Sequence, residues 1–482
     1  MLTLGYVEMG EELQVLEVFT VLLIYVPSAV LLLTHTVMYY VGRKHREEGR
    51  AKRAFNDRIT VAIPVRNEPI EYIDEALASI SSWSIRDLIE VVIVSDDIYE
   101  AYQEIERVAK KWRDQGVTVY VIWRREPRGY KAGALNTALW FSPSRYFYVM
   151  DVDSRVAEDF IVEACSLMEE NPGIAAVVSR WRGRNRETRV AEAVSSSMEF
   201  MVEALYRGRR ALNLPVFPLG TGTVYRTSVL REELGGWDEN RLLDDLEIGC
   251  RIMRLGRGIA YMDRHWVYVE VPRRLSSLRI QQERWVYGAV DVAIARLRDI
   301  LSSSQPWYAK LEALIYLLQY LPAIAVFIGF LLLTLITTIK PYDVLFNYWY
   351  IGVAWIAVAA LYALSFIDSL REKGYSTWKA LVNLGRASAI TVVLSPVFAK
   401  AFLKASLRLR AVFKRTPKGR YEARASNAKL RFPVEALIGI YALVYSIHLI
   451  TNRILFCGGW FLTYSLGYIY SLIRWWRDIV YR

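Results

Sequence analysis

Two carboxylates one residue apart open the chemistry that this sequence could perform. Asp151 and Asp153 follow the apolar run YFYVM, and carboxylates placed in this way can hold a hard divalent cation whose remaining ligands are phosphate oxygens. A diphosphate leaving group needs such neutralisation. A lone Asp-x-Asp triplet is more often a solvated loop or a helix cap, so its position after an apolar strand carries the interpretation.

Two further acidic pairs and one lysine stand at similar boundaries. Asp96 and Asp97 end the run VVIVSDD, where carboxylates could accept hydrogen bonds from a nucleobase or a ribose. Asp244 and Asp245 begin a helical pattern in LLDDLEIG. Lys131 in GYKAGALN lies at a helix start, where its ammonium and the helix amides could meet phosphate. Turns and caps are the local alternatives for the acidic pairs, and plain surface exposure is the alternative for the lysine.

The pentapeptide QQERW contains Gln281, Arg284 and Trp285 and stands just ahead of a long apolar stretch. Gln, Glu and Arg are costly to bury without partners, so core packing does not explain this cluster. The cluster predicts a polar binding site at a membrane face. The alternative is an amphipathic helix whose Trp and Arg only anchor it to lipid headgroups.

The elements that must position these side chains lie between about residues 56 and 304. The runs ITVAIPV, IEVVIVSDD, VTVYVIW and YFYVMDVDS predict strands that end in polar residues, and EYIDEALASI, AYQEIERVAKKW and KAGALNTALW predict the helices between them. This alternation is typical of an α/β domain with a mostly parallel sheet, whose ligands bind at the carboxyl ends of strands. The polar strand ends are therefore the predicted site.

The composition indicates an integral membrane protein, since 54% of the 482 residues are hydrophobic. Five crossings are predicted at Leu13–Tyr40, Leu311–Ile339, Phe346–Ile367, Val434–Ile450 and Leu455–Ile473. The basic flank GRKHREEGRAKR after the first crossing places the next domain in the cytoplasm and the N-terminus outside, in the plasma membrane. The formal charge of +11 lies largely beside apolar spans, so the lipid bilayer and not nucleic acid is the predicted partner.

The apolar segment Trp378–Val397 is predicted to be an amphipathic helix in the cytoplasmic interface. A sixth crossing would export the loop 399–431, which carries eleven Lys or Arg and a single Glu, against the positive-inside rule. The predicted divisions are a membrane anchor (1–45), a soluble catalytic domain (56–304), two crossings (305–370), an interfacial helix with a basic loop (371–431), and two crossings with a cytosolic tail (432–482).

Cysteine and histidine carry no predicted site. Cys165, Cys250 and Cys457 are far apart and odd in number, so neither a disulfide framework nor a zinc site is predicted. The four histidines are scattered, and only His265 falls inside the catalytic segment.

The motifs occur in the order IPVRNEP, SDD, KAGALN, DVD, GTGTVYR, DDLE, QQERW and FKRTPKG. This order resembles the membrane-integrated, processive family-2 glycosyltransferases, the group of cellulose, hyaluronan and related β-glycan synthases. The resemblance covers roughly Arg58 to the C-terminus. It implies a GT-A fold with transmembrane and interfacial helices, a nucleotide-diphosphate sugar as donor, commonly a UDP-sugar, and Mg²⁺ or Mn²⁺ as cofactor.

The resemblance also implies roles for the motif residues. Asp245 would be the catalytic base, although Leu243 and Asp244 replace the Thr and Glu that usually precede it. Trp285 would form the acceptor platform. The metal would be held by Asp151 and Asp153, and the donor would be bound by Asp96, Asp97, Lys131, Asp151, Gln281 and Arg284.

A gating loop is implied by FKRTPKG, in which Phe413, Thr416 and Lys418 match the family pattern FxVTxK. Arg415 stands where the family has Val, so closure over the nucleotide is expected to differ in detail. A closed loop would exclude water and limit hydrolysis of the donor. A basic loop bound to anionic lipid is the alternative.

The predicted function is inverting transfer of a sugar to a growing β-linked polysaccharide that passes through the membrane. One alternative is a nonprocessive transferase that adds one sugar to a membrane lipid, since such relatives share these motifs. The other is a noncatalytic polysaccharide channel or scaffold, against which the intact acidic motifs argue. The sugar, the linkage and any protein partner stay open.

Overall fold

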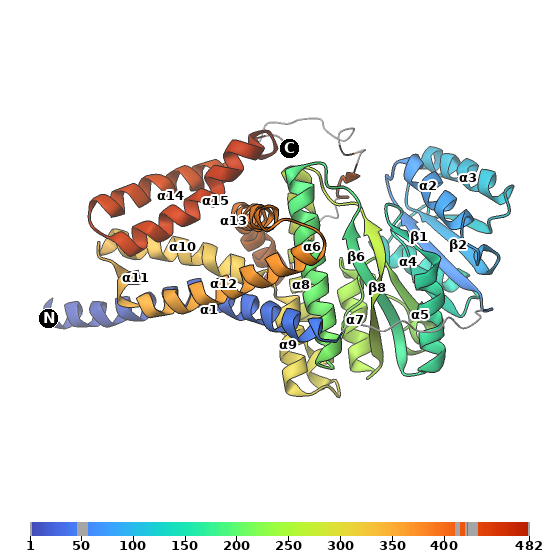
Figure 1. Cartoon of the computed structure of the whole chain (residues 1–482), viewed down its shortest axis with the longest axis horizontal. Helices are drawn as coiled ribbons and strands as arrows, with labels where there is room; N and C mark the ends of the chain where they lie inside the picture. Colours follow the sequence, from blue (N-terminus) through green and yellow to red (C-terminus); the bar gives the residue numbers. More distant parts are fainter. Residues whose placement is uncertain (1, 46–55, 410–414, 420–421, 423–431, 481–482) are drawn as a thin grey trace.

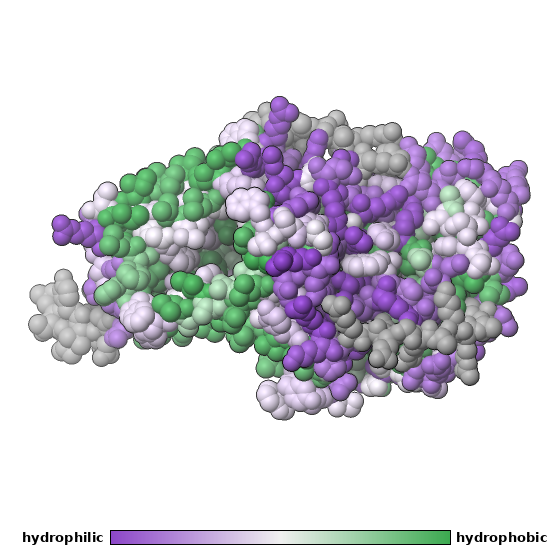
Figure 2. Space-filling view, in the orientation of Figure 1, coloured by the Kyte–Doolittle hydropathy of each residue, from purple (hydrophilic) through white to green (hydrophobic). Residues whose placement is uncertain are grey.

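The computed structural model describes residues 2–45, 56–409, 415–419, 422 and 432–480, with side chains from Glu12 onward. A bundle of long helices lies at one end of the molecule and a sheet with its covering helices lies at the other (Figure 1). In the space-filling view the helical end is largely hydrophobic and the sheet end largely hydrophilic (Figure 2). Helix α1 (Leu2–Arg43) begins at the end far from the sheet and runs toward it.

One mixed sheet of eight strands, in the order β3-β2-β1-β4-β7-β6-β8-β5, organises the polar end. The strands are β1 (Ile59–Val65), β2 (Ile89–Ser95), β3 (Val119–Trp123), β4 (Tyr146–Val149), β5 (Arg155–Val156), β6 (Ile174–Gly183), β7 (Thr223–Arg226) and β8 (Gly258–Val269). Strands β1 to β4 pair in parallel, as do β6 and β8, whereas β7 is antiparallel to both of its neighbours and β5 to β8. The α/β class and the four predicted strands are confirmed.

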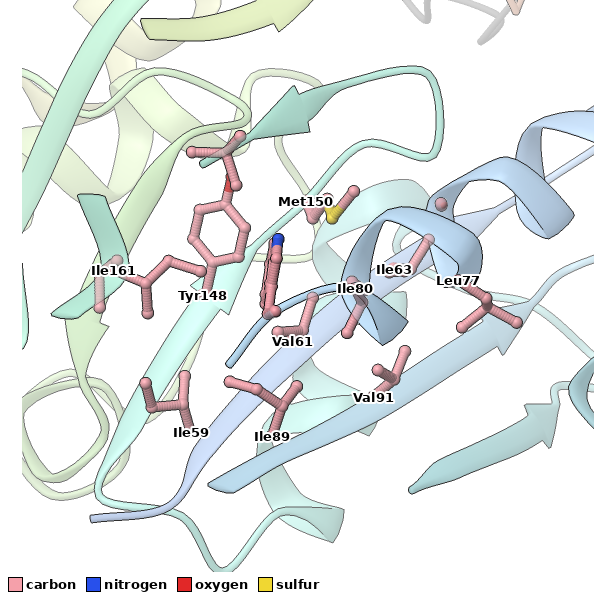
Figure 3. Packing of buried hydrophobic residues seen from close by; sticks show 14 of the residues in the cluster. Ile59, Val61, Ile63, Leu77, Ile80, Ile89, Val91, Tyr148, Met150 and Ile161 are labelled. Carbon is pink, nitrogen blue, oxygen red and sulfur yellow. The ribbon is translucent and has the colours of Figure 1, made fainter. Parts of the chain in front are cut away.

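Successive side chains along each strand point to opposite faces of the sheet, so they contribute to two hydrophobic layers. In β1, Ile59, Val61 and Ile63 face the layer that contains α2 (Ile70–Ser81), as Figure 3 shows, while Ala62 faces the opposite layer. Helices α3 (Tyr99–Arg113) and α5 (Glu158–Glu170) cover the first face, and α4 (Tyr130–Phe141) and α7 (Asp244–Arg254) cover the second. Each fully buried Val or Ile contributes about 1.5–3 kcal/mol relative to exposure, so the sheet is a rigid base for the loops at its edge.

Two long helices join the two ends of the molecule. Helices α6 (Arg189–Ala211) and α8 (Leu275–Ser302) supply Val190, Leu275 and Leu278 to the same apolar cluster as the long helices. The shorter elements are α9 (Trp307–Leu317), α11 (Val344–Asn347), a 3-10 turn at Arg86–Leu88 and a π-helical turn at Val229–Glu233.

The hydrophobic end contains α1, α10 (Leu321–Ile339), α12 (Trp349–Glu372), α13 (Thr377–Ser406), α14 (Val434–Thr451) and α15 (Leu455–Val480). Helices α1, α10 and α12 run along one another and α14 pairs with α15, whereas α13 is seen nearly end-on, across the others (Figure 1). Among the described residues, five segments are long and apolar enough to cross a membrane: Glu12–Arg43, Leu321–Ile339, Trp349–Glu372, Thr377–Ser406 and Val434–Thr451.

These five segments differ in membership from the five predicted crossings. The segment of α13, predicted to be interfacial, passes the criteria of length and composition, and α15 does not appear among the five. The crosswise path of α13 in Figure 1 is nevertheless the one expected of an interfacial helix.

The predicted crossing Leu311–Ile339 is wrong as a single helix. The chain turns between α9, which ends at Leu317, and α10, which begins at Leu321. The physical reason is Glu312, which is buried in an ion pair with Arg209 of α6 and so ties α9 to the polar end, with 2.7 Å between Oε1 and Nη2. The crossing predicted from Phe346 likewise starts later, at Trp349.

Candidate active site

A cavity of about 240 Å³ lies at the carboxyl ends of β1, β2 and β4 and extends to α8. Its lining contains most of the residues that the motifs singled out, drawn from segments far apart in the sequence. These residues are Asp96, Lys131, Asp151, Asp153, Asp245, Gln281, Arg284, Trp285, Thr416 and Lys418. The structure therefore brings these predicted residues together around one cavity.

Lys131 connects three of the motifs. It follows Gly129 and Tyr130, which both have positive φ (71° and 50°), so the chain turns sharply into α4. Its Nζ donates to Asp151 Oδ1 at 2.8 Å and to the Gly220 carbonyl at 2.5 Å, and lies 3.7 Å from Asp244 Oδ2. Burial would lower the pKa of Lys131, but the carboxylates of Asp151 and Asp244 raise it, so the ammonium stays charged.

Asp151 and Asp153 follow β4 and each accepts a hydrogen bond from a different lysine, Lys131 and Lys418. Burial opposes ionisation of Asp151, yet the ammonium groups of Lys131 and Lys418 outweigh it and lower the pKa of Asp151. Asp153 accepts a hydrogen bond from Lys418 Nζ at 3.1 Å. The neighbouring ammonium groups therefore favour the ionised form of Asp151, which is the state that a divalent metal requires of a carboxylate ligand.

The donor set of the Asp151 and Asp153 pair fits Mg²⁺ or Mn²⁺. Among the described residues, no group of three His, Cys, Asp or Glu side chains forms a complete metal site. Mg²⁺ is commonly held by one or two carboxylates while substrate phosphates and waters complete its shell, and the two Asp side chains in this cavity match that pattern.

Asp245 has the electrostatics of a general base. It follows Asp244 at the start of α7, and its Oδ1 accepts the Leu246 N–H at 2.8 Å. Burial, and next the negative charge of Asp244, raise the pKa of Asp245 to about 7. A Cβ added at Gly220 would lie 3.3 Å from Asp245 Oδ2, so the glycine leaves the approach to this oxygen open. A carboxylate with a pKa near neutrality can accept a proton at physiological pH.

Leu243, which stands where the family motif has Thr, has a packing role. A Cβ at Gly288 of α8 would lie 2.4 Å from Leu243 Cγ, so Leu243 fits against the glycine where α7 and α8 approach. This contact orients α7, and with it Asp245, relative to the pentapeptide on α8.

Gln281, Arg284 and Trp285 share one face of α8, because their spacing is i, i+3 and i+4. Gln281 is buried, and Arg284 lies among the acidic groups. Burial lowers the pKa of Arg284, and Asp151, Asp244 and Asp245 oppose that shift. Because all three residues line the cavity, the binding-site interpretation of the pentapeptide is favoured over simple headgroup anchoring.

Asp96 and Asp97 separate. Asp96 lines the cavity and pairs with Arg124, whose Nε and Nη2 each lie 2.6 Å from its carboxylate oxygens. Asp97 does not line the cavity, and its carboxylate accepts hydrogen bonds from the Asn67 N–H and from Ser95 Oγ. In this structure Asp97 therefore supports the loop after β1.

The basic loop after α13 contributes to the lining of the cavity. Thr416 and Lys418 line it, and Arg415 forms an ion pair with Glu68, with 2.8 Å between Nε and Oε1. Burial would lower the pKa of Arg415, but Glu68 raises it. Phe413, the first residue of the predicted gating motif, lies outside the described residues.

Sequence reasoning missed two functional candidates, Arg124 and Glu68. Arg124 directly follows the strand VTVYVIW, and Glu68 lies within IPVRNEP, so charged residues at strand ends were the signal that could have found them. The basic segment Trp181–Arg189 is largely structural, since Arg186 pairs with Glu199, although Trp181 lines the cavity. His265 pairs with Glu163 at 2.8 Å, and the three cysteines are buried and free.

Comparisons with known proteins place the chain among glycosyltransferases. The family model "Glycosyl transferase family group 2" matches residues 146–367. A protein of Sulfolobus acidocaldarius named as a probable glycosyltransferase is 30% identical over 481 residues, which cover 96% of this chain and 99% of that protein. A probable glucomannan 4-beta-mannosyltransferase of Arabidopsis thaliana is 26% identical over 56% of this chain and 49% of its own length.

A solved structure shares the fold. The mannosyltransferase from Pyrobaculum calidifontis, determined with GDP-mannose and Mn²⁺, aligns with a TM-score of 0.56 and 20% identity over 82% of this chain and 100% of that one.

Proposed function

The chain belongs to the family-2 glycosyltransferases, and we propose that it transfers a sugar from a nucleotide-diphosphate donor to an acceptor hydroxyl with inversion, aided by a divalent metal. One observation carries the proposal: the cavity joins a candidate base, Asp245, to two cationic groups, Lys131 and Arg284. A base and a cationic leaving-group site in one cavity are what a direct displacement needs.

The proposed reaction is a single displacement at the anomeric carbon. The acceptor oxygen forms a bond to the anomeric carbon, the bond from that carbon to the diphosphate oxygen breaks, and the acceptor proton passes to Asp245. Lys131, whose Nζ lies 2.8 Å from Asp151 Oδ1, and Arg284 would neutralise the charge that grows on the diphosphate. An α-linked donor would give a β-linked product. General-base help is worth about 10²- to 10⁴-fold.

Asp151 and Asp153 would hold Mg²⁺ or Mn²⁺, which when bound supplies positive charge to the diphosphate. The loop residues Thr416 and Lys418 would bind over the donor. Lys418 Nζ lies 3.1 Å from Asp153 Oδ2, and this contact supports a role for the loop in covering the site and excluding water.

Two similarities bear on the nucleotide and the sugar of the donor. The motifs resemble those of enzymes that commonly use UDP-sugars, whereas the plant relative is named for mannosyl transfer. We propose that the donor is either a UDP-hexose or a mannosyl nucleotide, with Asp96 at the nucleoside end of the cavity. Arg124 does not line the cavity but pairs with Asp96, so it would position this carboxylate to accept hydrogen bonds from a base or a ribose.

The proposed setting is the cytoplasmic face of the plasma membrane, with α1 crossing from outside and α13 in the interface. The two alternative acceptors are a growing polysaccharide that crosses the membrane and a membrane lipid that receives one sugar. The first needs a path along the crossing helices, and the second needs an apolar site for a hydrocarbon chain next to Asp245.

A donor panel tests the reaction class. The purified protein in lipid nanodiscs with Mg²⁺ or Mn²⁺ would be given radiolabelled UDP- and GDP-sugars, with Asp245→Asn as the control. We expect one donor to be consumed and the transfer to fall by about 10²- to 10⁴-fold in the variant. Consumption of no donor, or undiminished transfer by Asp245→Asn, would overturn the proposed function.

A further inference from the structure

A second cavity, of about 350 Å³, adjoins the first one. Asp245, Trp285 and Trp181 line both cavities, so an acceptor group placed at the base can continue into the second cavity. The remaining lining is drawn from α6, α7, α8, α9 and α13, from the turn between α9 and α10, and from Leu219 and Leu243 in the segments before β7 and α7.

Aliphatic and aromatic side chains dominate this lining. The apolar residues include Val194, Met198, Leu205, Leu278, Ile390 and Leu394. Apart from Asp245, the polar residues are Ser197, Gln282, Gln319, Thr391 and three tyrosines. Two of these tyrosines, Tyr206 and Tyr316, share a hydrogen bond between their hydroxyls at 3.3 Å. A chain of hexoses carries several hydroxyls per unit that need partners when buried, and this lining supplies few.

Of the five segments that could cross a membrane, the cavity follows only that of α13. Among the described residues, none from α1, α12, α14 or α15 lines it, and the approach to α10 stops at its N-cap Tyr320. At α13 the lining includes buried Ile390 and Leu394 and also Thr391, which is exposed. The cavity therefore opens beside α13, at the hydrophobic end that Figure 2 shows, and stays at the level where that end meets the sheet domain.

We propose that the acceptor is a membrane lipid, whose hydroxyl-bearing headgroup lies at Asp245 and Trp285 and whose hydrocarbon chain occupies the second cavity. This inference rests on the proposed function, because it places the acceptor of that same displacement. The lipid hydroxyl oxygen bonds to the anomeric carbon, its proton passes to Asp245, and the nucleoside diphosphate leaves. Because the chain comes from an equally apolar bilayer, its transfer gains little from the hydrophobic effect, so selection among acceptors would depend on how well the chain packs in the cavity.

Photolabelling tests the cavity without knowledge of the headgroup. The probe is a sixteen-carbon alcohol with a diazirine in mid-chain, added to the full chain in nanodiscs and mapped by mass spectrometry. We expect labels on α13 around Ile390 and Leu394. Ala387→Trp, which fills the cavity, should reduce them about tenfold, and Thr391→Trp at the opening should act in the same direction. Ser388→Trp is the matched control, because Ser388 is an exposed residue of α13 that does not line the cavity, and it should leave the labels unchanged.

The activity arm separates the two proposals. With the donor found by the panel, a radiolabelled product that is extracted into chloroform and methanol, and that is lost in Ala387→Trp but kept in Ser388→Trp, supports the lipid acceptor. A high-mass water-soluble polymer, or labels on α13 that Ala387→Trp and Thr391→Trp do not reduce, would overturn it while leaving the transfer reaction standing. No turnover of any donor would instead count against the proposed function, and the photolabelling would still decide whether the cavity binds a hydrocarbon chain.

Discussion

Replacement of Asp244 by asparagine should move the acid limb of the pH–rate profile to lower pH. Burial and then the charge of Asp244 raise the pKa of Asp245 to about 7. Because a general base must be unprotonated, about half of the enzyme is competent at pH 7 and about a tenth at pH 6. Asp244→Asn keeps the side-chain volume and removes the charge. A neighbouring like charge shifts a pKa by about one unit or more, so the competent fraction at pH 6 should rise about fivefold.

The assay is the rate of transfer from radiolabelled donor at subsaturating concentration, measured from pH 5 to 9 and normalised to the plateau of each variant. Asp291→Asn is the matched control. Asp291 of α8 pairs with Arg241 at 2.7 Å and does not line either cavity, so the acid limb of Asp291→Asn should coincide with that of the wild type. Coincident limbs in wild type and Asp244→Asn, or an equal shift in Asp291→Asn, would refute the assignment of the limb to Asp245.

Four further outcomes follow from the same contacts. The pKa of Asp245 is raised in the folded state, so ionisation of Asp245 destabilises the fold increasingly as pH rises from 3.8 toward about 7. Asp245→Asn should therefore stabilise the fold by about 1 kcal/mol or more at pH 8 and leave its stability unchanged at pH 4. Thermal unfolding measures both. Arg209 is 0% exposed and paired with Glu312, so Arg209→Met should cost about 3–5 kcal/mol, and the double variant with Glu312→Leu should recover most of that loss; an undiminished melting temperature in the single variant would contradict this. Chelation with EDTA should abolish transfer, and Asp153→Asn should raise the half-saturating Mn²⁺ concentration about tenfold or more; transfer that survives EDTA would remove the metal from the account. Lys131→Gln should weaken nucleotide-diphosphate binding about tenfold or more, measured by calorimetry, and unchanged affinity would mean that the lysine only supports Asp151.

Part of the sheet could be predicted because its first four strands can be recognised from their own residues. The four runs from Ile59 to Val149 are rich in β-branched residues and end in polar residues. Such continuous apolar runs are typical of parallel strands, which are buried on both faces of the sheet. The antiparallel strand β7 could not be predicted, since GTGTVYR is short and its pairing with β4 and β6 is set by tertiary packing.

At the site, the residue types were predictable and their pairing was not. Spacing placed Asp151, Lys131 and Asp245 at element ends, but the choice of partner depends on distances across the fold. Arg124 takes the carboxylate of Asp96 and leaves Asp97 to a structural role. The break between α9 and α10 was missed for the same reason, because hydropathy does not reveal that Glu312 has a buried cationic partner.

The most direct test of the central claim is the stereochemistry of the first product. Proton NMR of the reaction with an α-linked nucleotide sugar, followed from the earliest turnover, reports the configuration of the new glycosidic bond. Direct displacement with Asp245 as base predicts a β-linked product from the start. An α-linked first product would require a second displacement or attack from the leaving-group side, and would contradict the mechanism.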